Sequence, residues 1–140
     1  MSEAIIASFV PARAHIKEQP RTFERFAVQW TPTQLVLEPD GKERHRTEGF
    51  LPVDDFLAQL HLGLAKLDSG RQQYGEAVRR FRSVYEMFPT AGAAPEACYW
   101  VGVSAYKNTR NPEPLTETAR LLKSKYPDSK WTRKASVWSS

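Results

Sequence analysis

The period of the hydrophobic positions changes near residue 50. Before that point, Val10, Ala12, Ala14 and Ile16 alternate with polar or proline residues, and this alternation predicts a strand with one buried face over Val10–Lys17. The apolar segment Thr33–Leu37 predicts an inner strand. The charged segment Glu43–Glu48 is typical of an exposed edge strand, because charges discourage pairing with another chain.

Short helices and a tight turn complete the first half of the pattern. Ser2 is a suitable cap for a helix through Phe9, and Phe23, Phe26 and Ala27 lie on one face of a helix predicted over Thr22–Gln29. Glu38–Gly41, with its proline, aspartate and glycine, predicts a hairpin turn between the two later strands. The order of these elements predicts a small α+β or α/β sheet with helices.

The second half of the chain has the three- and four-residue spacing of amphipathic helices. A first helix is predicted from Pro52 to Gly70, a second ends before Pro89, and a third runs from Pro95 to about Lys107. A fourth helix is stopped by Pro127, and Asp128 or Ser129 is placed to cap a last short helix. Residues 52–140 are therefore predicted to be mostly α-helical.

Composition excludes several classes of function. The net charge of +4 is small, and the basic residues are interspersed with acidic ones, which favours a solvated surface over a nucleic-acid groove. No apolar run approaches the roughly 20 residues that cross a bilayer, and the N-terminus lacks the features of a signal peptide. We therefore expect a cytoplasmic protein that binds neither nucleic acid nor membranes.

The residue types that carry catalysis are not grouped in the sequence. Cys98 is the single cysteine, so a dithiol redox cycle within one chain is excluded, and its apolar surroundings favour a buried structural role. His15, His45 and His61 have no cysteine or carboxylate at metal-ligand spacing. Asp54 and Asp55 are neighbours that favour a helix N-terminus. We expect no enzyme activity, no metal and no cofactor.

One segment of the first half nevertheless resembles part of a thioredoxin domain. The resemblance covers roughly residues 4 to 60. The residues that carry it are Trp30-Thr31-Pro32-Thr33, Leu35-Val36-Leu37, Pro39-Asp40-Gly41, Arg46 and Gly49-Phe50. It implies that Pro32 follows a cis peptide bond. It also implies that the backbone before this proline, at Trp30 and Thr31, is the contact for an extended peptide, unless this segment is only a structural turn.

The departure from that family is large, because the chain has no Cys-x-x-Cys. In the family a further strand lies between the strands that correspond to Val10–Lys17 and Thr33–Leu37. Three outcomes follow: the two strands pair directly, a second copy of the chain fills the gap, or the chain is a fragment of a longer protein. Because an apolar strand is costly as an open edge, we expect a homodimer.

The helices of residues 52–140 resemble tetratricopeptide repeats. The residues that fall on the small, aromatic and terminal positions of that motif are Gly63, Tyr74, Ala77, Phe81, Pro89, Gly102, Ala119 and Pro127. The second repeat matches less faithfully and is longer than the usual period of about 34 residues. The predicted division is a truncated thioredoxin-like unit over residues 1–51 and a helical region over residues 52–140, with the helix from Pro52 shared by both.

These features predict a non-catalytic module that binds a protein or peptide partner. Two alternatives remain: a fragment or remnant of a thiol-disulfide oxidoreductase, and a holdase-like chaperone. Aromatic residues near the C-terminus fit either the core between repeats or a binding groove, namely Tyr99, Trp100, Tyr106, Tyr126, Trp131 and Trp138. Lys107, Arg110 and Lys123 are expected nearby, on a concave face suited to an acidic peptide.

Overall fold

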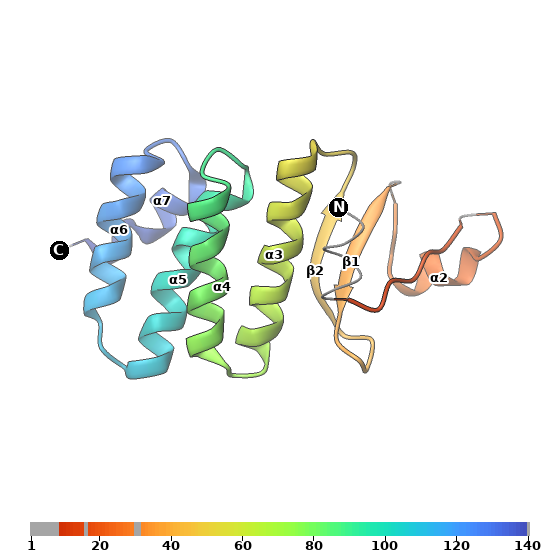
Figure 1. Ribbon diagram of the computed structural model, residues 1–140, viewed down its shortest axis with the longest axis horizontal. Helices are drawn as coiled ribbons and strands as arrows, with labels where there is room; N and C mark the ends of the chain where they lie inside the picture. The colour runs from red at the N-terminus through yellow and green to blue at the C-terminus, as the bar shows by residue number, and fades with distance from the viewer. Residues whose placement is uncertain (1–8, 16, 30–31, 140) are drawn as a thin grey trace.

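The computed structural model describes residues 9–15, 17–29 and 32–139. A β-hairpin lies against one side of a long helix, with a short N-terminal helix beyond the hairpin, and the helices that follow the long one continue the molecule on its other side (Figure 1). The elements run in the order α2 (Pro20–Arg25), β1 (Thr33–Leu37), β2 (Glu43–Glu48), α3 (Val53–Gly70), α4 (Tyr74–Met87), α5 (Ala93–Thr109), α6 (Glu113–Lys125), α7 (Lys130–Ala135) and a 3-10 turn, η1 (Ser136–Trp138). The predicted fold class, a truncated thioredoxin-like sheet followed by a helical region, is confirmed.

The hairpin forms where the sequence predicted it. Strands β1 and β2 pair antiparallel, with Thr33 opposite Glu48 and Val36 opposite His45. In the turn the N–H of Gly41 donates to the carbonyl of Glu38 at 2.8 Å, and Gly41 has a φ of 89°, a conformation that costs glycine little. Both predicted strands and the turn between them are therefore confirmed, but the inner position expected for Thr33–Leu37 is not, because β1 pairs with β2 alone among the described residues.

The strand predicted over Val10–Lys17 is wrong. Residues 9–15 have no regular secondary structure, and the Val10 side chain is 99% exposed. Alternation alone does not make a strand, because a strand needs a neighbour that pairs with its backbone groups and a face that buries its side chains. Pro11 offers no donor, and two of the four apolar positions are alanines, so this segment buries little. The described sheet accordingly holds two strands.

The helix predicted over Thr22–Gln29 is shorter and starts earlier than expected. Pro20 is the first residue of α2 and not a break before it, which agrees with the preference of proline for the first helical turn. The helix ends at Arg25 because Ala27, with a φ of 50°, has left the helical region. The guanidinium of Arg46 donates to the carbonyl oxygen of Phe26 and so ties this end to β2. The helix predicted over Ser2–Phe9 lies outside the described residues, apart from Phe9.

The five predicted helices after residue 52 are all present and form two layers. Helices α3, α5 and α7 make one layer, since α5 contacts both of the others, and α4 and α6 pack against them as a second layer. Figure 1 shows the row of helices that results, with α3 between the hairpin and α4. The third helix begins at Ala93, before Pro95, because a proline in the first turn removes no intrahelical hydrogen bond.

The core lies between the two helical layers. Its largest fully buried side chains are Phe81, Leu62, Leu122, Val84 and Cys98. Two glycines permit close approaches that set the layer geometry. A Cβ at position 63 would lie 2.7 Å from Cγ2 of Val36 in β1, and a Cβ at position 102 would lie 2.8 Å from Cβ of Thr118 in α6. The hairpin therefore packs on α3 at Gly63, and α6 packs on α5 at Gly102, two positions without a side chain.

Candidate functional site

Four half-buried aromatic side chains from α5, α7 and η1 gather together. Tyr99 is at the centre, with ring centroids 5.2 Å from Trp100, 5.1 Å from Trp131 and 4.8 Å from Trp138. The ammonium groups of Lys134 and Lys130 lie 4.4 Å and 5.6 Å from the centroid of the Trp131 ring, where cations are attracted by the aromatic face. We name Tyr99, Trp100, Trp131 and Trp138 the aromatic cluster.

A chain of polar side chains connects the hairpin to this cluster. Nε2 of His45 in β2 lies 2.6 Å from Oε1 of Gln59, and Nδ1 lies 3.2 Å from Nζ of Lys66, both in α3. Lys66 forms an ion pair with Glu96 of α5 at 2.9 Å, and the indole N–H of Trp100 donates to the same carboxylate at 3.4 Å. The hairpin and the helical layer therefore share one polar network.

Next to this network lies a pocket of about 410 Å³ that four elements build. Its lining residues are Arg44 from β2, Lys66, Ser69 and Gly70 from α3, Phe81 from α4, and Trp100 and Lys107 from α5. Three of these side chains are cationic, and none is acidic. The sequence pattern identified Lys107 as part of a basic face but missed Arg44 and Lys66, because neither charge pattern nor helical period tells which strand residue meets which helix.

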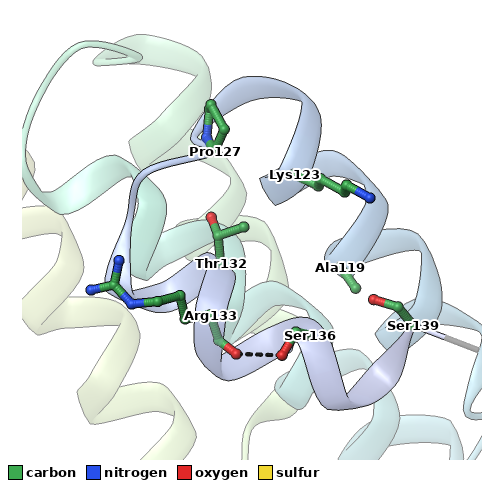
Figure 2. Close-up of a pocket in the computed structure, with 7 residues that line it drawn as sticks. All are labelled: Ala119, Lys123, Pro127, Thr132, Arg133, Ser136 and Ser139. Atoms are coloured by element: carbon green, nitrogen blue, oxygen red, sulfur yellow. Dashed lines mark hydrogen bonds between the residues drawn. The ribbon is translucent and has the colours of Figure 1, made fainter.

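The other two predicted basic residues lie elsewhere. The guanidinium of Arg110 lies 5.9 Å from the ring of Tyr106, beyond the end of α5. Lys123 lines a second pocket, between α6 and α7, of about 530 Å³. Figure 2 shows the Lys123 and Arg133 side chains pointing in opposite directions across this pocket. The hydroxyls of Ser136 and Thr132 in this second pocket donate to backbone carbonyls. The expected grouping of Lys107, Arg110 and Lys123 on one concave face is therefore wrong.

The segment that carried the thioredoxin resemblance is only partly described. Trp30 and Thr31 lie outside the described residues, and with them the peptide bond that precedes Pro32. Pro32 itself is half-buried at the start of β1, and its carbonyl oxygen accepts from the N–H of Gly49 at 2.7 Å. This bond holds the two ends of the hairpin together.

The residues predicted as repeat positions are placed in and around the helical core. Ala77, Phe81 and Ala119 are buried, as are the two glycines already described. Tyr74 is half-buried beneath Lys107, and Pro89 and Pro127 follow the ends of α4 and α6. The hydroxyl of Tyr126 donates to the carbonyl oxygen of Pro89 at 2.8 Å, so the two helix ends are joined.

The surroundings of Cys98 and the histidines do not indicate catalysis or metal binding. The Cys98 side chain is 1% exposed, and burial raises the pKa of its thiol to about 11, so the reactive thiolate is strongly disfavoured. His61 stacks on Phe88, and His15 is exposed. Across the described ranges no cluster of His, Cys, Asp and Glu is arranged to hold a metal ion. Nor is any helix there both long and apolar enough to cross a membrane.

The polar network makes stability depend on pH. Burial, and then the charge of Lys66, lower the pKa of His45 below 6.5, while Gln59, Glu96 and Glu43 oppose this shift more weakly; burial and Arg80 likewise lower the pKa of His61. Below pH 6.5 the unfolded chain therefore binds these protons more readily than the folded chain. The free energy of unfolding is expected to fall as the pH drops through 6.5 and below, until the histidines of the folded chain are also protonated.

Chemical denaturation across that range measures the effect. His45→Gln keeps a hydrogen-bonding group beside Gln59 and Lys66 but cannot titrate, so its stability should depend less steeply on pH than that of the wild type. The remaining slope should diminish further when His61→Gln is added. An unchanged slope in both variants would show that the histidines do not set this dependence.

One family model matches the first part of the chain. Residues 3–63 match the model of a family described as a thioredoxin-like domain. The matched segment is less than half of the chain, and it ends within α3, at the glycine on which β1 rests. The searches of curated proteins and of solved structures returned no match. The family match supports a thioredoxin-like domain in the first part of the chain.

Proposed function

We propose that this chain is a non-catalytic protein-interaction module in which a truncated thioredoxin-like unit and tetratricopeptide-like helices share helix α3. The module self-associates through its small sheet and offers the layer of α3, α5 and α7 to a protein or peptide partner. The observation that carries the proposal is the two-stranded sheet. Helix α3 covers one of its faces, and the edge of β1 opposite β2 has no strand beside it among the described residues.

That outer edge is a site for strand addition. Within the described part of the chain β1 pairs only with β2, and a two-stranded hairpin is at best marginally stable without further partners. The bond from Gly49 to Pro32 fixes which residues face β2, and the alternation of an antiparallel ladder then directs the backbone N–H of Leu35 to the outer edge. An added strand would find this donor at the edge of the sheet.

The helical layers support the repeat-like half of the proposal. Two antiparallel helix pairs, α3–α4 and α5–α6, stack so that small residues face large ones, as repeats of this kind require. Ala77 and Ala119 are buried at these contacts, and the close approach at Gly102 brings α6 onto α5. The family model matches up to residue 63, within α3, which supports assigning the first part of α3 to the thioredoxin-like unit. These observations favour a shared helix and one continuous core.

A second surface suits a partner other than the chain itself. The aromatic cluster is half-buried, so its rings combine a fixed position with apolar area open to solvent, and aromatic residues of this kind dominate protein interfaces. The ammonium groups of Lys130 and Lys134 lie over one of its rings, that of Trp131. The partner is therefore expected to bring apolar and acidic groups together.

Self-association is the first test of the proposal. Wild-type protein is expected to sediment as a dimer whose population rises with concentration. Leu35→Pro removes the N–H at the outer edge of β1 but leaves the ladder to β2 intact, since proline is tolerated where its nitrogen faces outward. We expect the variant to sediment as a monomer with an unchanged far-ultraviolet circular dichroism spectrum.

Leu35→Ala is the matched control, because it also shortens the side chain but keeps the backbone donor. It should remain dimeric if strand pairing, and not the leucine side chain, holds the dimer. A wild-type protein that stays monomeric at every concentration would contradict self-association through β1.

The family match favours one second candidate, a remnant of a thiol-disulfide oxidoreductase that would depend on Cys98. The described surroundings of Cys98 oppose it, because a thiol with a pKa of about 11 is almost entirely protonated at neutral pH. Reduction of insulin by this protein, lost in Cys98→Ser, would overturn the non-catalytic proposal in favour of the enzyme.

A further inference from the structure

The pocket between β2, α3 and α5 has the chemistry of an anion site. We propose that the pocket lined by Arg44, Lys66, Lys107 and Trp100 binds a small organic anion through a carboxylate or phosphate group. This inference adds a ligand class to one end of the proposed partner face. The anion site itself does not depend on the proposed function; only the identity of the larger partner rests on it.

Arg44 is held in place by the shape of the helix beneath it. Its guanidinium lies across Gly70, where a Cβ would come within 2.8 Å of both Nε and a terminal nitrogen. One terminal nitrogen forms an ion pair with Glu38 at 3.1 Å, whereas Nε is buried and has no hydrogen-bond partner. Arg44 therefore lines the pocket with hydrogen-bonding capacity that Glu38 does not use, and its positive charge is held in place at the pocket.

The carboxylates around the pocket do not neutralise its cations. Glu38 is shared between Arg44 at 3.1 Å and Arg71 at 3.8 Å, so one carboxylate serves two guanidinium groups. Lys66 is paired with Glu96. Lys107 makes no ion pair with any carboxylate of the described chain, and its ammonium lies only over the ring of Tyr74, at 5.8 Å. The pocket therefore keeps an excess of positive charge.

The size and lining of the pocket suit a small molecule or a single side chain that stays partly open to solvent. A volume of about 410 Å³ lies in the range of sites that hold small ligands. The indole of Trp100 and the ring of Phe81, which stack with centroids 6.5 Å apart, form the apolar part of the wall. An anionic group at Lys107 and Arg44, attached to an apolar or planar portion against Trp100, fits this combination.

Two probes test the site and separate the two sources of the anion. Pyrophosphate and citrate are titrated, at matched ionic strength, into uniformly ¹⁵N-labelled wild-type protein, and amide and indole signals are followed by NMR. The indole signal of Trp100 is assigned from its loss in Trp100→Phe. A binding isotherm at Trp100 and Gly70 for either probe supports the site, and the probe that binds more tightly identifies phosphate or carboxylate as the preferred group.

A matched pair of lysine variants decides whether the binding is local. Lys107 and Lys125 each lie in the last turn of a helix over a tyrosine ring, at 5.8 Å and 5.9 Å, but only Lys107 lines the pocket. Lys107→Gln is expected to weaken binding about tenfold, as the loss of a hydrogen bond to a charged group implies. Lys125→Gln, which removes the same charge, should leave the affinity within about twofold of the wild type.

Two results would overturn the proposal. One is that neither probe shifts the Trp100 and Gly70 signals. The other is that both lysine variants weaken binding equally, which would indicate attraction to net charge alone. Because the probes are small and no partner protein is added, either result leaves the self-association test untouched, and a monomeric wild type would leave the pocket proposal intact.

Discussion

Replacing Phe81 with alanine is expected to lower the free energy of unfolding by about 3–5 kcal/mol, the usual cost of removing a buried aromatic side chain. Phe81 is 1% exposed, is the largest of the fully buried side chains and projects from α4 into the core. Small domains are stable by only about 5–15 kcal/mol, so this one change should remove a large part of the stability. Guanidinium denaturation followed by circular dichroism measures it.

Met87 provides the control for this substitution. It lies in the same helix and is also a large apolar residue, but 57% of its surface is exposed. Met87→Ala should change the free energy of unfolding by about 0.5 kcal/mol or less. Because Phe81 stacks on Trp100, the tryptophan fluorescence of Phe81→Ala should also change before denaturant is added. Equal losses in the two variants would mean that Phe81 is not a core residue.

The helices and the hairpin could be predicted because local sequence determines them. Proline and glycine mark the ends of α3, α4 and α6, and the turn at Gly41 has the residue types that its backbone requires. Ser129 accepts from the N–H of Trp131 at the start of α7, so one of the two predicted caps is confirmed. Each of these features depends on neighbours within a few positions in the chain.

The strand expected over Val10–Lys17 failed because strands depend on partners that lie far away in the sequence. The family resemblance supplied a sheet in which that strand has a place, and a short run of alternation then agreed with it. Nothing in the alternation measures how much area each residue buries. The exposed Val10 shows that this segment does not bury its apolar face.

Only part of the candidate site could be predicted, for the same reason: the rest depends on contacts between residues that are far apart in the sequence. The crowding of aromatic residues near the C-terminus was visible in the sequence, and Trp100 and Trp131 do meet around Tyr99. The basic pocket was not visible, since it needs Arg44 from a strand beside Lys107 from a helix more than sixty positions later. Gly70 makes that meeting possible by leaving room for the guanidinium, and a lone glycine at a helix end gives no sign of this role.

Replacing Gly63 with leucine is expected to separate the hairpin from α3. A Cβ at this position would lie 2.7 Å from Cγ2 and 3.3 Å from Cβ of Val36, and 3.4 Å from Cβ of His45. Overpacking of this kind costs about 1–3 kcal/mol. The higher helix propensity of leucine, worth roughly 1 kcal/mol, stabilises α3 whether or not the hairpin rests on it, so it does not offset the cost to the strands. The strands should therefore lose about 2 kcal/mol of protection in hydrogen exchange, roughly a thirtyfold faster exchange of the β1 and β2 amides.

Gly75 allows the effect of helix propensity on stability to be measured separately. It also lies within a helix, α4, but a Cβ there would meet no atom within 4 Å. Gly75→Leu should stabilise the protein by about 0.5–1 kcal/mol, because only the propensity of the helix changes. The difference between the two variants then reports the contact of β1 with α3. If both variants were stabilised alike, the hairpin would not rest on Gly63, and the thioredoxin-like unit would not share a core with the helices through α3.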